Sequence, residues 1–145
     1  MDKSLARSKI LVADDTITER LILEKLLKKQ GHDVVSAADG VAAIALFTSF
    51  QPDLILMDAL MPGMDGFETL KVIKSRPDTK NIPVIMYTSQ HAHKYYEEAH
   101  TLGAAGVISK QIDRDKLYLM INRLCLNSTN NISQSADQDV PTVYQ

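Results

Sequence analysis

Residues 54–66 read LILMDALMPGMDG, and this stretch predicts the fold of the chain. Its first four residues are all apolar, which is typical of a strand covered on both faces of a parallel sheet. The apolar run leads directly into Asp58. The Pro and Gly residues that follow predict a loop, and a helix is expected over residues 67–75. The stretch therefore indicates a buried strand with an acidic residue at its end, followed by a helix.

A short apolar run followed by a helical pattern recurs along the chain. Strands are predicted over residues 10–13, 34–37, 54–57, 84–87 and 106–108, and helices over residues 17–30, 40–49, 67–75, 93–102 and from 114 onward. Strands that alternate with helices in this way predict a parallel sheet with helices on both faces. Right-handed crossovers at this chain length favour a doubly wound α/β fold, a five-stranded parallel sheet of order 2-1-3-4-5 with five helices.

The predicted helices carry local start and stop signals. Thr16, with Glu19 three residues later, predicts a capping box at the start of the first helix. Asp39 and Asp113 are expected to cap the second and the last helix. Gly31 is expected to end the first helix.

The composition of the chain changes after residue 126. Residues 127–145 read NSTNNISQSADQDVPTVYQ and contain no Lys or Arg. Such a segment lacks the apolar side chains that it would need to fold alone. We expect one domain over residues 9–126 and a polar, disordered tail or linker over residues 127–145.

The overall composition argues against several classes of protein. The chain has 145 residues, of which 45% are hydrophobic and 23% charged, so it is long and apolar enough for one domain with a core. No apolar run is long enough to span a bilayer, and the first residues do not form a secretory signal. A single cysteine and a net charge of −2 argue against a disulfide framework and against a basic nucleic-acid-binding domain. We expect a cytoplasmic protein that contacts neither nucleic acid nor a membrane.

Polar residues stand where the predicted strands end. The first strand ends in Asp14 and Asp15, the third in Asp58, the fourth in Thr88 and the fifth in Lys110. Because parallel strands bring their carboxyl ends to one edge of the sheet, we expect these side chains to share a small pocket. Clustered carboxylates repel one another unless a cation lies among them, and oxygen ligands suit Mg²⁺. An aspartate can also act as a nucleophile on phosphorus. The inferred chemistry is phosphoryl acceptance at an aspartate.

This ordered set of residues, together with the MPGMDG loop, resembles the receiver domain of two-component response regulators, which have a CheY-like fold. The resemblance covers residues 9–126. It implies that Asp58 is the phosphoacceptor, that Thr88 is a switch hydroxyl and that Lys110 is the cation that binds the phosphoryl group. It also implies that the phosphoryl donor is a phosphohistidine on a sensor histidine kinase or a phosphotransfer protein.

The resemblance further implies a magnesium site and a mode of signalling. Asp14 and Asp15 would be acidic residues of the metal site, with Asp15, Asp58 and the backbone carbonyl of Leu60 as direct ligands of Mg²⁺. Signals would pass by protein contact, through the fourth and fifth helices and the fifth strand, to an unknown target. Some receivers form homodimers through these helices on activation.

The chain departs from the family pattern at three positions. Receivers often have an aromatic residue three positions before the lysine, where this chain has Val107, and proline after it, where this chain has Gln111. An aromatic switch and a cis peptide bond after Lys110 are therefore not expected. Leu60, two positions after Asp58, is apolar and cannot orient an attacking water by hydrogen bonding. We expect no enzymatic turnover and at most a slow self-catalysed dephosphorylation.

Two other functions are alternatives to the receiver interpretation. A degenerate receiver would bind partners without phosphorylation, which Val107 and Gln111 would suit. A Mg²⁺-dependent phosphatase would use Asp58 as nucleophile, but such enzymes generally have a second Asp where this chain has Leu60. Either a stand-alone regulator or a receiver cut from a longer protein fits the sequence.

Overall fold

The computed structural model describes residues 7–61, 63–88, 96–110 and 114–129. Three expectations fall wholly or partly elsewhere. The cap at Asp113, the first residues of the helix expected over 93–102 and most of the tail expected over 127–145 lie outside the described residues.

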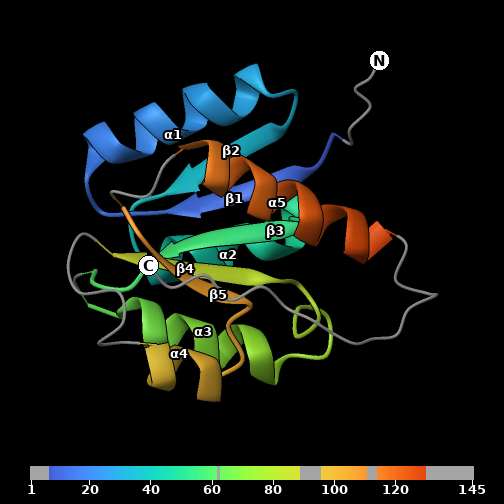
Figure 1. The fold of residues 1–145 in the computed structure, drawn as a ribbon. Helices are drawn as coiled ribbons and strands as arrows, with labels where there is room; N and C mark the ends of the chain where they lie inside the picture. Colours follow the sequence, from blue (N-terminus) through green and yellow to red (C-terminus); the bar gives the residue numbers. More distant parts are fainter. Residues whose placement is uncertain (1–6, 62, 89–95, 111–113, 130–145) are drawn as a thin grey trace.

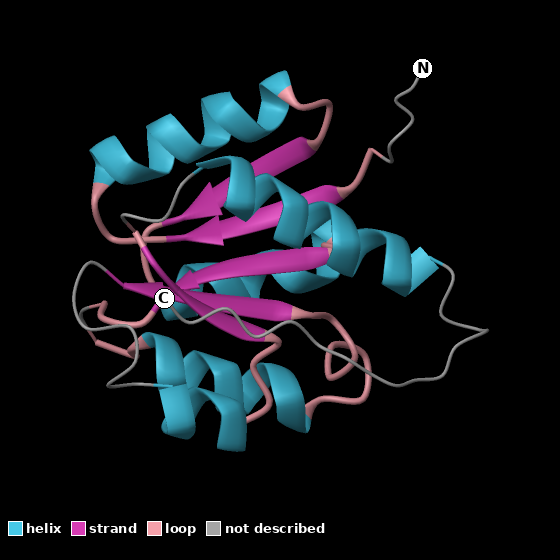
Figure 2. Cartoon of the chain, in the orientation of Figure 1, coloured by secondary structure: helices cyan, strands magenta, loops and turns pink. Residues whose placement is uncertain are grey.

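Five parallel strands form one sheet in the order β2-β1-β3-β4-β5, as the sequence predicted. Their bounds are β1 Lys9–Ala13, β2 Asp33–Ala37, β3 Leu54–Asp58, β4 Val84–Thr88 and β5 Gly106–Ser109. The strands run side by side with helices layered on both sides (Figure 2). Because every pair is parallel, all carboxyl ends lie at the same edge of the sheet.

Helices cover both faces of the sheet (Figure 1). Their bounds are α1 Ile17–Lys29, α2 Gly40–Phe50, α3 Gly66–Ser75, α4 Tyr96–Thr101 and α5 Arg114–Thr129. One core cluster joins the sheet to α1 and α5, and the other joins it to α2, α3 and α4. No helix in the described ranges combines the length and the apolar character that a membrane crossing needs.

The central strands are buried along their whole length because both faces are covered. Every residue of β3 and of β4 is buried. Alternate side chains pack on opposite faces: Ile55 and Met57 belong to the α2–α4 side, and Leu56 to the α1–α5 side. Consecutive apolar residues in the sequence therefore reflect a sheet with helices on two sides.

Three strands extend one residue further at their carboxyl ends than the sequence predicted. β3 includes Asp58, β4 includes Thr88 and β5 includes Ser109. The reason is the backbone ladder, which pairs Asp58 with Tyr87 and Thr88 with Ser109. The polar side chains thus stand on regular strand backbone, and the ladder fixes their positions.

The capping box predicted at Thr16 is wrong. The Thr16 side chain caps no backbone N–H of α1. Its own N–H instead donates to the Asp14 carboxylate at 2.9 Å, so the chain enters α1 through a turn that Asp14 holds. A capping box does occur at α3, between Asp65 and Glu68. The expected cap of α2 is confirmed, since the Asp39 carboxylate accepts from Ala42 N–H at 2.8 Å.

The last helix runs past residue 126, where the sequence analysis expected the domain to end. Helix α5 continues to Thr129. Three residues of the expected tail therefore have a helical backbone.

Gly66 lets α3 start directly beneath the end of β3. Its N–H donates to the Ala59 carbonyl at 3.1 Å. A Cβ at Gly66 would collide with the Asp58 carbonyl oxygen and lie 2.9 Å from the Ala59 Cα. Both are backbone atoms, which cannot move aside without displacing the loop after Asp58. The absence of a side chain at Gly66 thus sets the distance between α3 and the sheet edge.

We predict that Gly66→Ala lowers the free energy of unfolding by about 3 kcal/mol, because the added methyl group overpacks against backbone. Gly31→Ala is the matched control: Gly31 has φ +98° but nothing within 4 Å of an added Cβ. That variant should lose only about 1 kcal/mol, from the left-handed backbone conformation. Urea denaturation of the two variants measures both values. An equal loss in both would contradict the close-approach argument.

Candidate functional site

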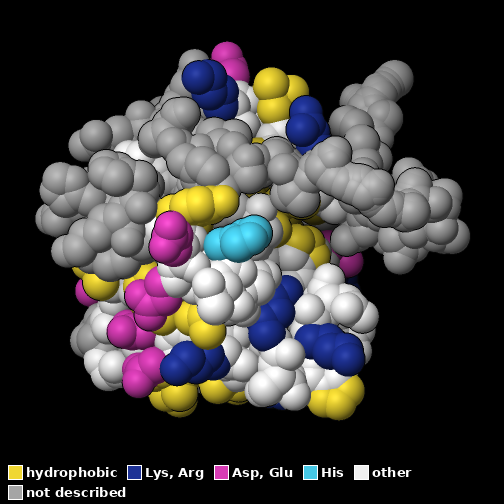
Figure 3. Space-filling model, turned by 60° about the horizontal axis from the view of Figure 1, so that its bottom comes forward, with side chains coloured by type: hydrophobic (Ala, Val, Ile, Leu, Met, Phe, Trp, Pro, Cys, Tyr) yellow, Lys and Arg dark blue, Asp and Glu magenta, His cyan; other side chains and the backbone are white. Residues whose placement is uncertain are grey.

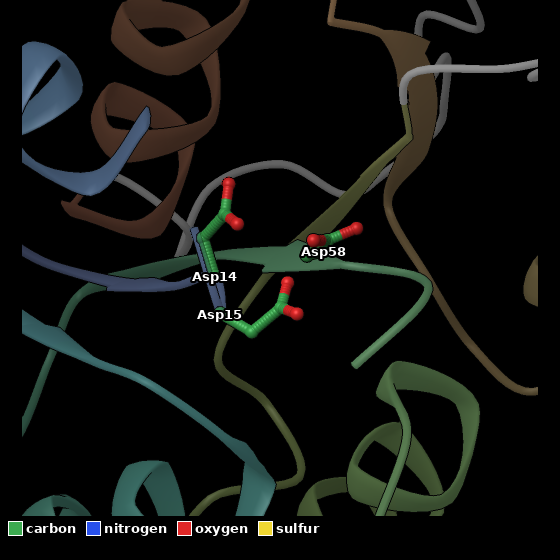
Figure 4. A group of neighbouring side chains, drawn as sticks. All are labelled: Asp14, Asp15 and Asp58. Atoms are coloured by element: carbon green, nitrogen blue, oxygen red, sulfur yellow. The ribbon is translucent and has the colours of Figure 1, made fainter. Parts of the chain in front are cut away.

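Three carboxylates gather at the carboxyl edge of the sheet (Figure 4). Asp14 and Asp15 follow β1, and Asp58 ends β3. One oxygen from each lies within 4.8 Å of the others. Asp14 is fully buried and Asp58 is 4% exposed, whereas Asp15 is exposed to solvent. We call this cluster of Asp14, Asp15 and Asp58 the acidic pocket.

Lys110 brings a positive charge into the acidic pocket. Its backbone N–H donates to the Thr88 carbonyl at 2.8 Å, which holds the residue beside the end of β4. Its Nζ lies 3.0 Å from an oxygen of Asp14 and 3.3 Å from an oxygen of Asp58. Burial alone would lower the pKa of Lys110, but the hydrogen bond to Asp14 and the charges of Asp58 and Asp14 raise it. Lys110 is therefore an ammonium ion shared by two carboxylates.

Asp14 is held by groups on three elements. Its Oδ1 accepts from the Thr16 N–H at 2.9 Å. Its Oδ2 accepts from the Tyr87 hydroxyl at 2.7 Å and lies 3.0 Å from the Lys110 ammonium. The Arg20 guanidinium donates to the Asp14 backbone carbonyl at 2.8 Å. The three contacts at Oδ1 and Oδ2 compensate for the complete burial of this carboxylate.

Asp58 carries less compensation than Asp14. Its Oδ1 accepts from the Leu60 N–H at 3.1 Å, and its Oδ2 from Lys110. Burial raises the pKa of Asp58 to about 7; Lys110 opposes this shift, and the negative charge of Asp14 adds to it. Without a cation, Asp58 therefore holds its proton to a higher pH than an exposed aspartate does.

Two of the other predicted residues, Thr88 and Leu60, also lie at this edge. Thr88 ends β4 with its side chain buried. Leu60 follows Asp58 with its side chain 47% exposed. Val107 lies on β5, buried in the core cluster on the α2–α4 side, where a receiver often has an aromatic ring. Gln111 lies outside the described residues.

Sequence reasoning missed Tyr87. The sequence pattern marks Tyr87 only as the last residue of an apolar strand, yet its hydroxyl reaches Asp14 from β4. A signal was available, because a tyrosine on a fully buried strand needs a partner for its hydroxyl. Burial and the neighbouring Asp14 raise the pKa of Tyr87, so the phenol stays protonated and acts as a donor.

The acidic pocket fits a hard divalent cation. All three side chains offer oxygen, the ligand that Mg²⁺ prefers. Among the described residues, three carboxylates face the Lys110 ammonium, and the charge of Asp14 adds to the effect of burial in raising the pKa of Asp58. The exposed Asp15 leaves one side of the pocket open to solvent.

Comparisons with known proteins agree on one family. The family model for the response regulator receiver domain matches residues 10–122. Protein PilH of Pseudomonas aeruginosa is 34% identical over 115 residues, which cover 79% of this chain and 95% of that protein. Sporulation initiation phosphotransferase F of Bacillus subtilis is 35% identical over 113 residues, 78% of this chain and 90% of that protein.

Solved structures show the same fold. The chemotaxis protein CheY4 of Vibrio cholerae superposes with a TM-score of 0.76 at 31% identity, covering 82% of this chain and 99% of that one. Longer relatives also match: at 34% identity this chain spans 26% of their length. The fold is therefore CheY-like α/β, as the sequence predicted.

We predict that Asp58 makes stability depend on pH when no divalent cation is present. Its pKa of about 7 lies above the ordinary value of 3.8, so its contribution to stability is complete below about pH 4 and is lost as pH rises through 7. The stability of Asp58→Asn relative to wild type should therefore grow with pH, by up to about 1.4 kcal/mol per unit. Urea denaturation in EDTA from pH 5 to pH 8 tests this.

The matched control is Asp78→Asn. A hydrogen bond from Arg76 lowers the pKa of Asp78, so this carboxylate titrates below the window. The stability of Asp78→Asn relative to wild type should stay constant from pH 5 to pH 8. A constant difference for Asp58→Asn as well would contradict the assignment of a raised pKa to Asp58.

Proposed function

Because this chain belongs to the family of response regulator receiver domains, we propose that it accepts a phosphoryl group on Asp58 in a Mg²⁺-dependent reaction and then signals by protein contact. Receiver domains interact with histidine kinases or phosphotransferases, and they are typically phosphoacceptors rather than enzymes. One observation carries the proposal: a buried carboxylate at a strand end lies 3.3 Å from an ammonium and beside two further carboxylates.

The proposed transfer starts from a phosphohistidine of a sensor kinase or phosphotransfer protein. A carboxylate oxygen of Asp58 attacks phosphorus, a P–O bond forms, and the P–N bond breaks with its electron pair remaining on the imidazole nitrogen. The Leu60 N–H, 3.1 Å from Oδ1, orients the carboxylate. The Lys110 ammonium binds an oxygen of the transferred group and balances its charge.

We propose that Asp15, Asp58 and the backbone carbonyl of Leu60 hold Mg²⁺, with Asp14 contributing charge nearby. The bound ion supplies positive charge that stabilises the phosphoryl oxygens. Asp14 is a poor direct ligand, since its oxygens already accept three hydrogen bonds or ion-pair contacts. Asp15 is the exposed carboxylate of the pocket and needs little rearrangement to bind the ion.

The donor is proposed to dock over the first residues of α1. Helix α1 starts two residues after Asp15, and the large apolar side chains of Ile17 and Leu21 are exposed there, one turn apart. An apolar patch beside a charged pocket suits a protein surface that brings a phosphohistidine to Asp58. We propose that residues 9–126 make up the receiver domain, and α5 continues past this boundary to Thr129.

The signal is proposed to pass from Thr88 to α4, β5 and α5. The Thr88 hydroxyl binds the phosphoryl group, and the movement changes the surface that a target protein reads. Val107 is buried and has no ring to swing, so we propose that the change starts at Thr88. On the face shown in Figure 3, acidic and basic side chains both reach the surface, which fits a protein partner better than a nucleic acid.

A phosphorylation-independent binding module is the second candidate, favoured by Val107 at the position where receivers often carry an aromatic residue. A phosphatase is less well supported, because Leu60 stands where a general acid would be needed.

We expect wild-type protein to gain one phosphoryl group from acetyl phosphate and Mg²⁺, as measured by intact mass. Asp58→Ala and Asp58→Asn should gain none, because the nucleophile is absent, and EDTA should abolish the gain in wild type. Asp78→Asn, which removes an exposed carboxylate elsewhere, should react like wild type. A folded wild-type protein that binds Mg²⁺ but gains no mass would favour the binding module. Steady release of phosphate from a phosphomonoester would favour the phosphatase.

We expect the phosphoryl group on Asp58 to be lost slowly, over minutes or longer. Leu60 lies beside Asp58 and has no polar atom on its side chain to orient a water. Leu60→Asn supplies such a group and should speed hydrolysis, whereas Leu60→Met should not. The decay of phosphorylated protein in Mg²⁺ buffer, followed by intact mass, gives the rates. A wild-type half-life of seconds would refute this expectation.

A further inference from the structure

A tyrosine hydroxyl lies inside the acidic pocket, among its charged groups. Tyr87 is the fourth residue of β4, and its ring packs in the core cluster on the α1–α5 side. Its hydroxyl donates to Asp14 Oδ2 at 2.7 Å. The distance is that of a short, charge-assisted O–H···O⁻ bond, which is among the stronger hydrogen bonds in proteins. Tyr87 therefore has a polar role beside its packing role.

The Asp14 oxygen that Tyr87 binds is the same one that faces Lys110. Oδ2 takes the Tyr87 hydroxyl and lies 3.0 Å from the Lys110 ammonium, while Oδ1 takes the Thr16 N–H. Asp14 is fully buried, so a loss of donors at Oδ2 would leave charge without solvent to replace them. The hydroxyl and the ammonium therefore share the stabilisation of one buried charge.

Tyr87 also contacts Lys110. The Lys110 Nζ lies 5.1 Å from the centre of the Tyr87 ring, within the range of a cation–π interaction. From that position the ammonium reaches Asp14 at 3.0 Å and Asp58 at 3.3 Å. Tyr87 thus contacts both Lys110 and Asp14. Asp14 in turn competes with Asp58 for the Lys110 ammonium.

We propose that Tyr87 is a positioning residue: its hydroxyl keeps Asp14 bonded, so that Lys110 can leave Asp14 and turn to the phosphoryl group arriving at Asp58. The inference rests on the proposed function of Asp58. With an apolar residue in place of Tyr87, the described side chains would leave Lys110 as the donor at Oδ2. When Lys110 moved away, Asp14 Oδ2 would lose this remaining side-chain donor. Phosphoryl transfer to Asp58 would therefore be slower.

The first test compares Tyr87→Phe with Tyr118→Phe. Both changes remove one hydroxyl and keep the ring, and Tyr118 packs against the same core cluster. The rate of phosphorylation by acetyl phosphate is measured by intact mass over a range of Mg²⁺ concentrations. The maximal rate of Tyr87→Phe should fall about tenfold, the effect of losing a hydrogen bond to a charged group. Its half-saturating Mg²⁺ concentration should stay unchanged, since the hydroxyl bonds none of the proposed ligands. Tyr118→Phe should match wild type.

The second test needs no phosphoryl transfer. In metal-free protein labelled with ¹⁵N-lysine, the exchange of the Lys110 ammonium protons with water is followed by NMR. Exchange should be slower in Tyr87→Phe, because Asp14 then depends more on Lys110, and unchanged in Tyr118→Phe. If wild type takes up no phosphoryl group, the proposed function fails, and this measurement still decides the role of Tyr87.

Three results would overturn the inference. Equal maximal rates in Tyr87→Phe and wild type, even with a lower melting temperature in the variant, would reduce Tyr87 to a packing residue. If Tyr87→Phe changed the half-saturating Mg²⁺ concentration but not the maximal rate, Tyr87 would act on the metal site and not on Lys110. Unchanged exchange of the Lys110 ammonium protons would show that the hydroxyl does not influence the Lys110–Asp14 pair.

Discussion

The buried charge of Asp14 is the constraint on which the rest of the site depends. A fully buried carboxylate is stable only when donors surround it, and here they come from the start of α1, from β4 and from the end of β5. These donors hold three separate segments of the chain close to the Asp14 carboxylate. The contact with Asp14 also places the Lys110 ammonium next to Asp58. The bonds that stabilise the sheet edge are therefore the same ones that hold the groups of the acidic pocket together.

The scaffold supports this edge by packing on both faces. The fully buried β3 and β4 fix Asp58 and Thr88 through their backbone ladders, and neither residue depends on a loop for its position. Gly66 brings α3 close beneath Asp58. The Asp58 carboxylate is thus held away from solvent. Its burial is the largest cause of its raised pKa.

Much of this arrangement could be predicted from the sequence. Apolar runs that end in Asp14, Asp58 and Lys110 must bring those residues together once the strands are parallel, because topology alone determines which ends meet. Two features could not be predicted in this way. The capping box expected at Thr16 does not form, because the Asp14 carboxylate accepts the Thr16 N–H. Tyr87 was missed because periodicity records only that a residue is apolar enough for a strand, while its hydroxyl acts across the sheet on a residue 73 positions away.

The neighbours Asp14 and Asp15 differ in one further respect. One carboxylate is sealed in the protein and the other meets bulk water, although they are consecutive residues. An ion that approaches the pocket from solvent would therefore meet the exposed Asp15 carboxylate first. The residence time of such an ion is then governed by how quickly it sheds and regains its own water shell, which for magnesium is a slow step. Occupancy of the proposed site would then follow the ion concentration in the surrounding solution.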